Sequence, residues 1–553
     1  MNDLARRSFL AGSLGVGAAM ALAACADRSD PGTGSGGGKT NLVVAVSALA
    51  PSLNGVLDGN GLTLQAFEMN ANLQAGLVRN PYLANAKTPG SVVQNFNTYT
   101  GYVAESYEVS ADGLKYTFHL RKNLKGPLGN PITADDVIYS FKRKWSVPTY
   151  ATASWGDFKG PDAITKVDDH TVTFEIPSAG FGLTFLGLLA NLQGHIYDSA
   201  LLKKHATKDD PWTLKWSANN GGWGLGPYYM SSQTPDQEMI LAANPNYAYG
   251  APPIKKVTLR VVTDAGTRAS LVVSGAADMA EDILPTDQAK LKSNKSVVVP
   301  EVANPIAYPD LTLVTNKAPF NDVKVRQAFA YAVPYTQIMK QIYAGRAVPM
   351  KGNINPGMKN YSTASLPTPT YDAKKAKSLL AAAGHPDGLA FTLSVSTATA
   401  DLVNACSLIK SYAADAGFDI TIEQMPAAEF GTARTNATKQ AIIYLNRSQV
   451  QTPTYACITF FKPHDDPSSP SRWEDALNKK FWTYVDKADA LKDTLSPEGG
   501  RLWAEAQKVQ IDAAAEIFVC GIQPTQIYRK NVSGFAYRSE NAIDFGNVKI
   551  SSE

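Results

Sequence analysis

The sequence is poor in cysteine and histidine, which limits the metal and redox chemistry that it can support. It contains 4 cysteines and 6 histidines among 553 residues. No Cys-x-x-Cys pair is present, and the histidines lack the spacing of a metal motif such as His-Glu-x-x-His. We therefore expect no redox function, no cofactor and no intrinsic metal site. Apart from Cys25, the cysteines are Cys406, Cys457 and Cys520. Either two of them form one disulfide, or all three are buried free thiols.

Strong net charge and long apolar runs are also absent. The formal net charge is +3, from 52 basic and 49 acidic side chains. This balance argues against nucleic-acid binding, which needs a strongly basic surface. Beyond the N-terminal region, no stretch matches the roughly 20 apolar residues of a membrane span. With 44% hydrophobic and 18% charged residues, the chain has the composition of a folded protein, and its length predicts more than one lobe.

The first 40 residues combine the features of an export signal and a flexible tether. Arg6 and Arg7 resemble a twin-arginine signal, although the general export route is an alternative. An uncharged Ala-, Gly- and Leu-rich stretch follows and ends in Leu-Ala-Ala before Cys25. This tetrapeptide resembles the lipobox in which the cysteine receives a diacylglycerol. We predict a signal peptide over 1–24, a Gly/Ser-rich tether over 25–40, and lipid anchoring of Cys25 at the extracytoplasmic face of the cell membrane as the only membrane contact.

Local patterns predict a mixture of strands and helices. Alternating apolar residues predict strands over 115–121, 171–176 and 256–262. Thr133-Ala134-Asp135-Asp136 resembles a capping box, and two more helices are predicted to begin near Asp322 and at Asp372. Because no clean βαβ repeat appears, we expect α/β lobes with strands inserted between them.

Several segments, in order along the chain, resemble the signature of one family. They are residues 105–121, 132–137, 224–228, 244–247, 274–278, 316–328 and 528–535. The most specific is the segment 316–328, which begins Asn-Lys-Ala-Pro-Phe-Asn-Asp. On these residues the chain resembles the extracellular solute-binding proteins of peptide and nickel ABC importers, the oligopeptide/dipeptide-binding family. The resemblance covers about residues 42 to 537.

That resemblance implies a fold, a division into lobes and a function. The implied fold is α/β, a two-lobed clamshell of the type II periplasmic-binding-protein kind with an extra subdomain on lobe one. Lobe one would comprise 41–306 plus 521–553, and lobe two 307–520. The protein would act as a monomer that captures an extracellular solute, foremost an oligopeptide or peptide-like compound, and delivers it to an ABC permease with its ATPase. The alternatives are a non-peptide solute (an opine, an oligosaccharide or a metal chelate) and a sensory or structural lipoprotein on the same fold.

The resemblance also implies that three loops hold the ligand, namely 50–60, 148–155 and 444–455. Tyr150 matches the position of an aromatic side chain that contacts the ligand in peptide binders, and Trp155 lies close to it in sequence. Flat, rigid rings supply contact area at a small entropy cost. The alternative for both rings is an ordinary core or surface position.

The third loop departs from the family's pattern. Peptide-binding members usually carry a Trp and an Asp in a stretch like Gly-Trp-x-x-Asp-Tyr, and the Asp pairs with the peptide's α-amino group. Residues 440–456 contain neither, and candidate ligand contacts there are Tyr444, Asn446, Arg447 and Gln449. Arg447 offers a fixed positive charge to an anionic ligand, or is an exposed loop residue without a role. Asp58, in the first loop, is the candidate to replace the missing acid.

One pattern associated with catalysis is present in isolation. Ser407-Leu408-Ile409-Lys410 matches the Ser-x-x-Lys of penicillin-recognising hydrolases, but neither Ser-Asp-Asn nor Lys-Thr-Gly accompanies it. We therefore predict a binding protein and not an enzyme.

Overall fold

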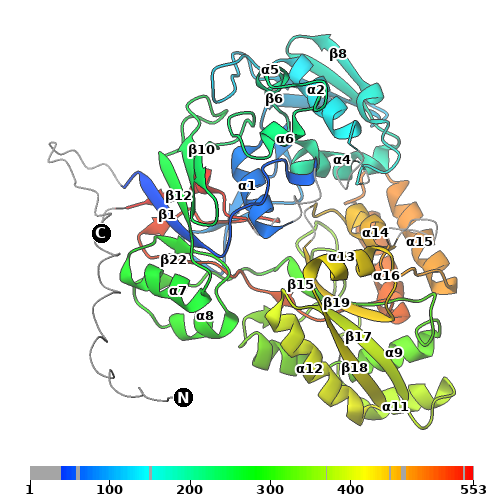
Figure 1. The fold of residues 1–553 in the computed structure, drawn as a ribbon. Coiled ribbons are helices and arrows are strands. Elements are labelled where there is room, and N and C mark those ends of the chain that lie inside the picture. The colour runs from blue at the N-terminus through cyan, green and yellow to red at the C-terminus, as the bar shows by residue number, and fades with distance from the viewer. Residues whose placement is uncertain are drawn as a thin grey trace, which may run out of the picture. The chain divides into compact units, whose positions relative to one another are not determined.

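The computed structural model describes residues 39–57, 63–147, 152, 154–368, 370–447, 450–461, 469–539 and 542–551. Arg6, Arg7 and Cys25 lie outside these residues, as do the expected ligand contacts Asp58, Tyr150 and Gln449. The described chain is a mixed α/β structure in which two large sheets are each covered by helices (Figure 1).

Within the described residues, the first large sheet has seven strands in the order β10-β11-β12-β1-β13-β22-β14. Strand β1 lies in the middle and pairs in parallel with β12 on one side and β13 on the other. These strands are β1 (Asn41–Val46), β10 (Tyr228–Thr234), β11 (Glu238–Ala243), β12 (Lys256–Val261), β13 (Met279–Ala280), β14 (Val297–Val298) and β22 (Ile527–Arg529), and the associated helices are α1 (Leu64–Leu73), α7 (Ala265–Ser274) and α8 (Pro285–Leu291).

The second large sheet, again counted over the described residues, has the order β16-β21-β15-β19-β17-β18, with β20 also paired to β15. Its strands are β15 (Ala307–Leu313), β16 (Ala347–Val348), β17 (Leu389–Ser396), β18 (Phe418–Met425), β19 (Ala441–Arg447), β20 (Glu516–Phe518) and β21 (Gly521–Ile522). Its helices are α9 (Val323–Ala332), α10 (Tyr335–Gln337), α11 (Ala373–Ala382), α12 (Ala400–Asp415), α13 (Ala427–Thr435), α14 (Pro453–Phe461), α15 (Ala476–Asp489) and α16 (Pro497–Ala513).

A smaller antiparallel sheet, β6-β7-β9-β8, is inserted between strands of the first sheet. Helix α2 packs on it, and an aromatic core fills the space between them. The elements are β6 (Ala104–Val109), β7 (Lys115–Leu120), β8 (Ile164–Asp168), β9 (Thr171–Glu175), α2 (Ala134–Trp145), α4 (Gly182–Leu189), α5 (Ser199–Lys204) and α6 (Leu214–Ser217).

The remaining elements are short. Two-residue and three-residue strands pair around the first sheet: β2 (Val78–Arg79), β3 (Tyr82–Ala84), β4 (Val92–Gln94), β5 (Thr100–Gly101), β23 (Val532–Ser533), β24 (Ala536–Tyr537) and β25 (Lys549–Ile550). Single helical turns are η1 (Gly55–Leu57), η2 (Gly160–Ala163), η3 (Ala179–Phe181), η4 (Leu192–Gly194), η6 (Phe545–Asn547) and the π-turn η5 (Ile338–Ile342).

The chain passes between the two large sheets twice. The first passage lies between β14 and β15, and the second between β21 and β22. Because Ile522 of β21 pairs with Ala307 of β15, the residues that leave the second sheet are 523–526. Few residues therefore connect the sheets, which is the arrangement that a hinge requires.

The local predictions are confirmed where the sequence signal is periodic. Strands β7, β9 and β12 occupy the predicted stretches to within a residue or two. The capping box of α2 is formed, with the Thr133 amide donating to the Asp136 carboxylate at 2.8 Å. Asp322 and Asp372 accept first-turn amide hydrogen bonds at the starts of α9 and α11.

The thiols of the described chain are free. Cys406, Cys457 and Cys520 are all buried and none is in a disulfide. Of the two alternatives left by the sequence, the structure therefore has the free thiols. No helix in the described ranges has both the length and the apolar composition needed to cross a bilayer.

Candidate functional site

A cavity of about 700 Å³ lies between the two large sheets. One wall comes from loops of the first sheet and the other from the ends of β17 and β19 and from α12 and α13. The polar and charged side chains that line it are Ser47, Thr63, Gln65, Asp282, Tyr343, Ser396, Thr399, Asp401, Arg434, Tyr444, Arg447, Gln523 and Thr525. A volume of this size is typical of small-molecule sites.

The first wall is built where parallel strands end. Because β1 and β13 run side by side in parallel, Ser47 and Asp282 follow them at the same edge of the sheet. The Ser47 hydroxyl donates to the Asp282 carboxylate at 2.7 Å, and the Gln65 amide donates to Ser47 at 3.2 Å. Asp282 has a φ of 52°, a left-handed conformation that is uncommon outside glycine. Ligands of open α/β sheets bind at the carboxyl ends of the strands.

Arg447, the last residue of β19, carries a positive charge on the second wall. Its Nε is buried and has no hydrogen-bond partner among the described residues. Burial lowers the pKa of the guanidinium, while Asp282 on the first wall and Asp401 at the start of α12 act in the opposite direction. Asp401 is oriented by the Tyr343 hydroxyl, which donates to it at 3.0 Å. An arginine remains protonated in proteins, so the cavity contains a fixed cation with an acid on each wall.

Tyr444 and Asn446 lie on the opposite face of β19 from Arg447, because side chains alternate along a strand. The Tyr444 hydroxyl and the Asn446 amide both donate to the Asp310 carboxylate, at 3.2 and 3.0 Å. Burial raises the pKa of Asp310 to about 6, and these hydrogen bonds oppose the rise. Tyr444 lines the cavity as well, whereas Asn446 is not among the lining residues.

A second cation reaches the cavity from α13. The Arg434 guanidinium lies 4.1 Å from the centroid of the Tyr444 ring and lines the cavity. Its charge lowers the pKa of two buried acids, Asp310 and Glu516, and so opposes the larger rise that burial causes. The second wall therefore presents guanidinium groups from two elements.

The structure places Trp155 in the aromatic core of the inserted subdomain. It is 0% exposed and packs against Phe158 and Phe141, with ring centroids 5.2 and 5.5 Å away. Its indole N–H has no hydrogen-bond partner among the described residues, and the ring is not part of the cavity wall. This is the ordinary core position that the sequence left as the alternative.

The third expected loop is divided between two environments. Tyr444 and Arg447 line the cavity, but the segment that follows packs on the inserted subdomain. There, Val450 and Tyr455 join the core of that subdomain, and the hydroxyls of Thr452 and Thr184 are 2.8 Å apart. The chain of the second sheet thus contacts the first lobe directly beside the cavity.

Sequence patterns did not indicate three of the charged residues in the cavity. Asp282 follows a strand of only two residues, which shows no alternation. Asp401 and Arg434 lie on the helices α12 and α13, whose sequences carry no motif that marks a binding residue. The one available signal was the position of Asp282 four residues after the end of the segment 274–278, which resembles a family motif.

No group of three or more His, Cys, Asp or Glu side chains that could hold a metal ion occurs among the residues that the structure describes.

Comparison with known proteins agrees with this geometry. Residues 98–467 match the family model of bacterial extracellular solute-binding proteins, family 5 Middle. Heme-binding protein A of Haemophilus influenzae is 33% identical over 303 residues, 52% of this chain and 54% of that protein. The chain thus spans about half the length of this relative. The probable D,D-dipeptide-binding periplasmic protein DdpA of Escherichia coli strain K12 is 29% identical over 452 residues, covering 79% and 82% of the two chains.

Solved structures show the same fold. The ABC transporter-associated periplasmic binding protein DppA from Helicobacter pylori, in complex with the peptide STSA, superposes with a TM-score of 0.75 at 22% identity and covers 93% of this chain and 99% of its own. The predicted two-lobed clamshell of type II is therefore confirmed. Since the family model matches more than half of the chain, this protein belongs to the bacterial extracellular solute-binding proteins of family 5.

Proposed function

We propose that the cavity between the sheets is the ligand site of an ABC importer's solute-binding component, and that its first class of cargo is an oligopeptide or peptide-like compound. The observation that carries this proposal is a cavity of about 700 Å³ with charged side chains on both walls. Two relatives from Escherichia coli are named as a probable D,D-dipeptide-binding periplasmic protein and a dipeptide-binding protein. The protein would pass the solute to a permease and its ATPase.

A clamshell binder gains affinity from contacts that exist only when the lobes are closed. The proposed lobes are 41–306 with 521–553, and 307–520. Because Ile522 pairs within the second sheet, we place the second hinge of the clamshell at 523–526. Rotation about this segment and about the passage between β14 and β15 would open the cavity.

The cavity favours a ligand that carries charges of both signs. Arg447 and Arg434 can pair with carboxylates, and Asp282 or Asp401 with an ammonium group. A peptide with free ends has both groups. The Asp that holds the α-amino group in peptide-binding family members is absent from 440–456. We therefore propose Asp282 and Asp401, in addition to Asp58, as candidates for the α-amino contact. Tyr150, Gln449 and Asp58 remain proposed contacts.

The location and assembly state are further parts of the proposal. The protein would be exported by the signal in 1–24, anchored through lipidated Cys25 at the extracytoplasmic face of the membrane, and active as a monomer without catalysing a reaction. The family and its named relatives are binding proteins, which supports the absence of catalysis.

The test is a calorimetric titration of the purified protein with free and N-acetylated oligopeptides. A free peptide that binds, with strong loss on acetylation, would mean that an acid of the cavity holds the amine. Equal binding of both forms would mean that the amine is not recognised. If neither form binds, a thermal-shift screen with opines, oligosaccharides and metal chelates tests the non-peptide alternative. A protein that responds to none of these would favour the sensory or structural alternative.

A further inference from the structure

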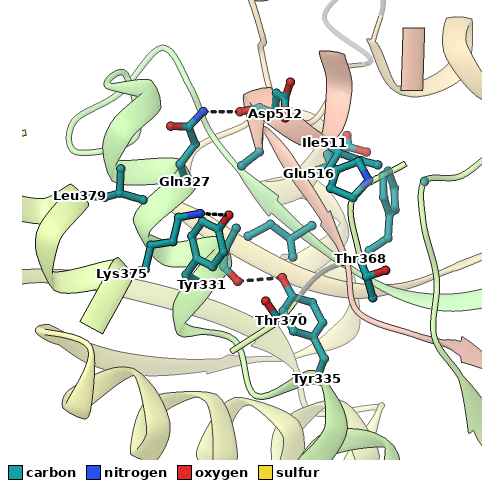
Figure 2. Close-up of a pocket in the computed structure, with 16 residues that line it drawn as sticks. Gln327, Tyr331, Tyr335, Thr368, Thr370, Lys375, Leu379, Ile511, Asp512 and Glu516 are labelled. Atoms are coloured by element: carbon teal, nitrogen blue, oxygen red, sulfur yellow. Dashed lines mark hydrogen bonds between the residues drawn. The ribbon is translucent and has the colours of Figure 1, made fainter. Parts of the chain in front are cut away.

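A second cavity, of about 300 Å³, lies within the second lobe (Figure 2). It shares no lining residue with the cavity between the sheets. Its walls come from α9, α11, the end of α16 and the residues Pro367, Thr368 and Thr370, and its floor is strand β20. Its volume lies at the lower end of the roughly 300–1,000 Å³ range of ligand pockets.

Strand β20 is bonded on one side only. Its residues pair with β15 in antiparallel register, with Glu516 opposite Thr312 and Phe518 opposite Asp310. The flanking amides show which pairs carry the hydrogen bonds: Leu313 N–H donates to Ala515 O at 2.9 Å and Val519 N–H to Pro309 O at 3.1 Å. Hydrogen-bonded pairs alternate with non-bonded pairs in an antiparallel ladder. The backbone N–H and C=O groups of Glu516 and Phe518 therefore point away from β15.

These outward groups are buried without a partner. Glu516 is 2% exposed and Phe518 is 4% exposed, and both line the second cavity. No hydrogen bond to their backbone groups is formed by the described residues. The Glu516 carboxyl, in contrast, interacts with Asp310 and with Arg434, which lines the cavity between the sheets. More than nine in ten buried backbone polar groups are paired in native proteins, so an edge of this kind is expected to be satisfied by an occupant.

The other walls indicate the chemistry of that occupant. The lining residues outside β20 are of two kinds: apolar ones (Ala330, Pro367, Leu379, Ile511 and Ala514) and polar or charged ones (Gln327, Tyr331, Tyr335, Thr368, Thr370, Lys375 and Asp512). A cation stands among them, since the Lys375 ammonium donates to the Tyr331 hydroxyl at 2.6 Å and lies 4.1 Å from the centroid of that ring (Figure 2). The cavity thus combines an unpaired strand edge, apolar and polar wall residues, a positive charge from Lys375 and a negative charge from Asp512.

We infer that this cavity binds a short extended peptide of about three residues, which adds to the outer edge of β20 through the backbone of Glu516 and Phe518, with apolar side chains against the walls and its terminal carboxylate at Lys375. Addition of a strand to an open sheet edge is a common mode of peptide recognition, in which the main-chain hydrogen bonds supply affinity. The site is separate from the cavity between the lobes, and the inference does not depend on the cargo proposed for that cavity.

The test uses the amide of Phe518 as a local reporter. Protein labelled with [15N]phenylalanine is titrated with trialanine, and the Phe518 resonance is assigned from its loss in Phe518→Leu. We expect a saturating downfield shift of the Phe518 amide proton. Trialanine methylated on both peptide nitrogens cannot donate to the strand edge and should give no such shift.

Two comparisons separate this site from the cavity between the lobes. Ala330→Phe fills the second cavity and should abolish the shift, whereas Ala381→Phe, at an exposed position of the neighbouring helix α11, should retain it. Lys375→Gln, at an exposed helical position, should lower the affinity for trialanine several-fold. The affinity for trialanine amide, which lacks the terminal carboxylate, should not change. This second comparison remains decisive if Ala330→Phe fails to fold.

Three results would overturn the inference. The absence of any Phe518 shift up to millimolar trialanine would mean that water alone satisfies the strand edge. A shift that survives in Ala330→Phe but is lost in Arg447→Ala would mean that the peptide enters only the cavity between the lobes. Equal affinities of trialanine and its amide for the wild type would remove the role of Lys375 and with it the proposed orientation.

Discussion

Among the residues that line the cavity, Arg447 gives the most direct prediction about the charge of the ligand. It is a cation on the second wall with one unpartnered buried nitrogen and acids on both sides. We predict that Arg447→Ala weakens an anionic or zwitterionic ligand, because loss of one partner of a desolvated charge pair costs on the order of 2–5 kcal/mol. The melting temperature without ligand should hardly change. Calorimetry and thermal melts measure both quantities.

A matched control for this substitution is Arg501→Ala. Arg501 lies on α16, pairs with Glu498 at an exposed position and is not part of the cavity wall. Its loss should leave affinity unchanged. If Arg447→Ala binds the ligand as tightly as Arg501→Ala does, the guanidinium of Arg447 is not a ligand contact.

Two buried acids of the first lobe predict how stability depends on pH. Burial raises the pKa of Glu281 to about 8, and it raises the pKa of Glu68 well above its ordinary value. The folded state therefore binds protons that the unfolded state has released, so the free energy of unfolding should fall as pH rises from about 5 to 9. Glu281→Gln should reduce that slope, whereas Glu498→Gln, at an exposed position, should not. Melting temperatures between pH 5 and 9 measure the slope, and a steeper decline in Glu281→Gln would contradict this assignment.

At the scale of elements, helix α2 shows how a local signal is used by the tertiary structure. Asp136 closes the capping box on the Thr133 amide at 2.8 Å and also accepts the Ser199 amide of α5 at 2.8 Å. Thr133→Ala should cost about 1 kcal/mol, which is typical of a lost cap. Asp136→Ala should cost more, because it removes the acceptor of both the part-buried Thr133 amide and the buried Ser199 amide. Urea denaturation should give this order of stability, and the reverse order would mean that the cap dominates.

The elements that the sequence predicts are those with a periodic or capped pattern, such as β7, β12 and α2. Strands β13, β20 and β21 have two or three residues each, and so short a stretch carries no alternation. They become strands through long-range pairing with other strands, which in β20 takes place on one side only. The two residues that carry the most consequence, Asp282 after β13 and Glu516 in β20, are positioned by these short strands.

The candidate site could be predicted only in part for the same reason. Tyr444 and Arg447 were found because they stand where family members hold ligand, and both line the cavity. Asp282 and Arg434 lie far from them in sequence and meet them only across the fold. Trp155 is of a residue type that often contacts ligands. It is buried in an aromatic core by side chains of α2 and β9, and no local sequence pattern shows that these side chains contact it.

At the scale of the whole molecule, the anchoring proposal predicts where the protein is found in the cell. Cys25→Ala should move the folded protein from the membrane to the soluble extracytoplasmic fraction, because the acyl acceptor is lost. Changing Arg6 and Arg7 together to lysine should block export if the twin-arginine route is used. Fractionation with immunoblotting measures both effects. A Cys25→Ala protein that stays fully membrane-bound would contradict the lipid anchor.

The central claim is that the solute is held between the lobes by both walls of the cavity. The most direct test is calorimetric titration of one ligand, found by the peptide screen, into wild type, Asp282→Asn and Arg447→Ala, which alter the first and the second wall. The account predicts that each substitution weakens binding at least tenfold while the unliganded protein remains folded. Unchanged affinity in both variants would contradict it, because the ligand would then bind outside this cavity.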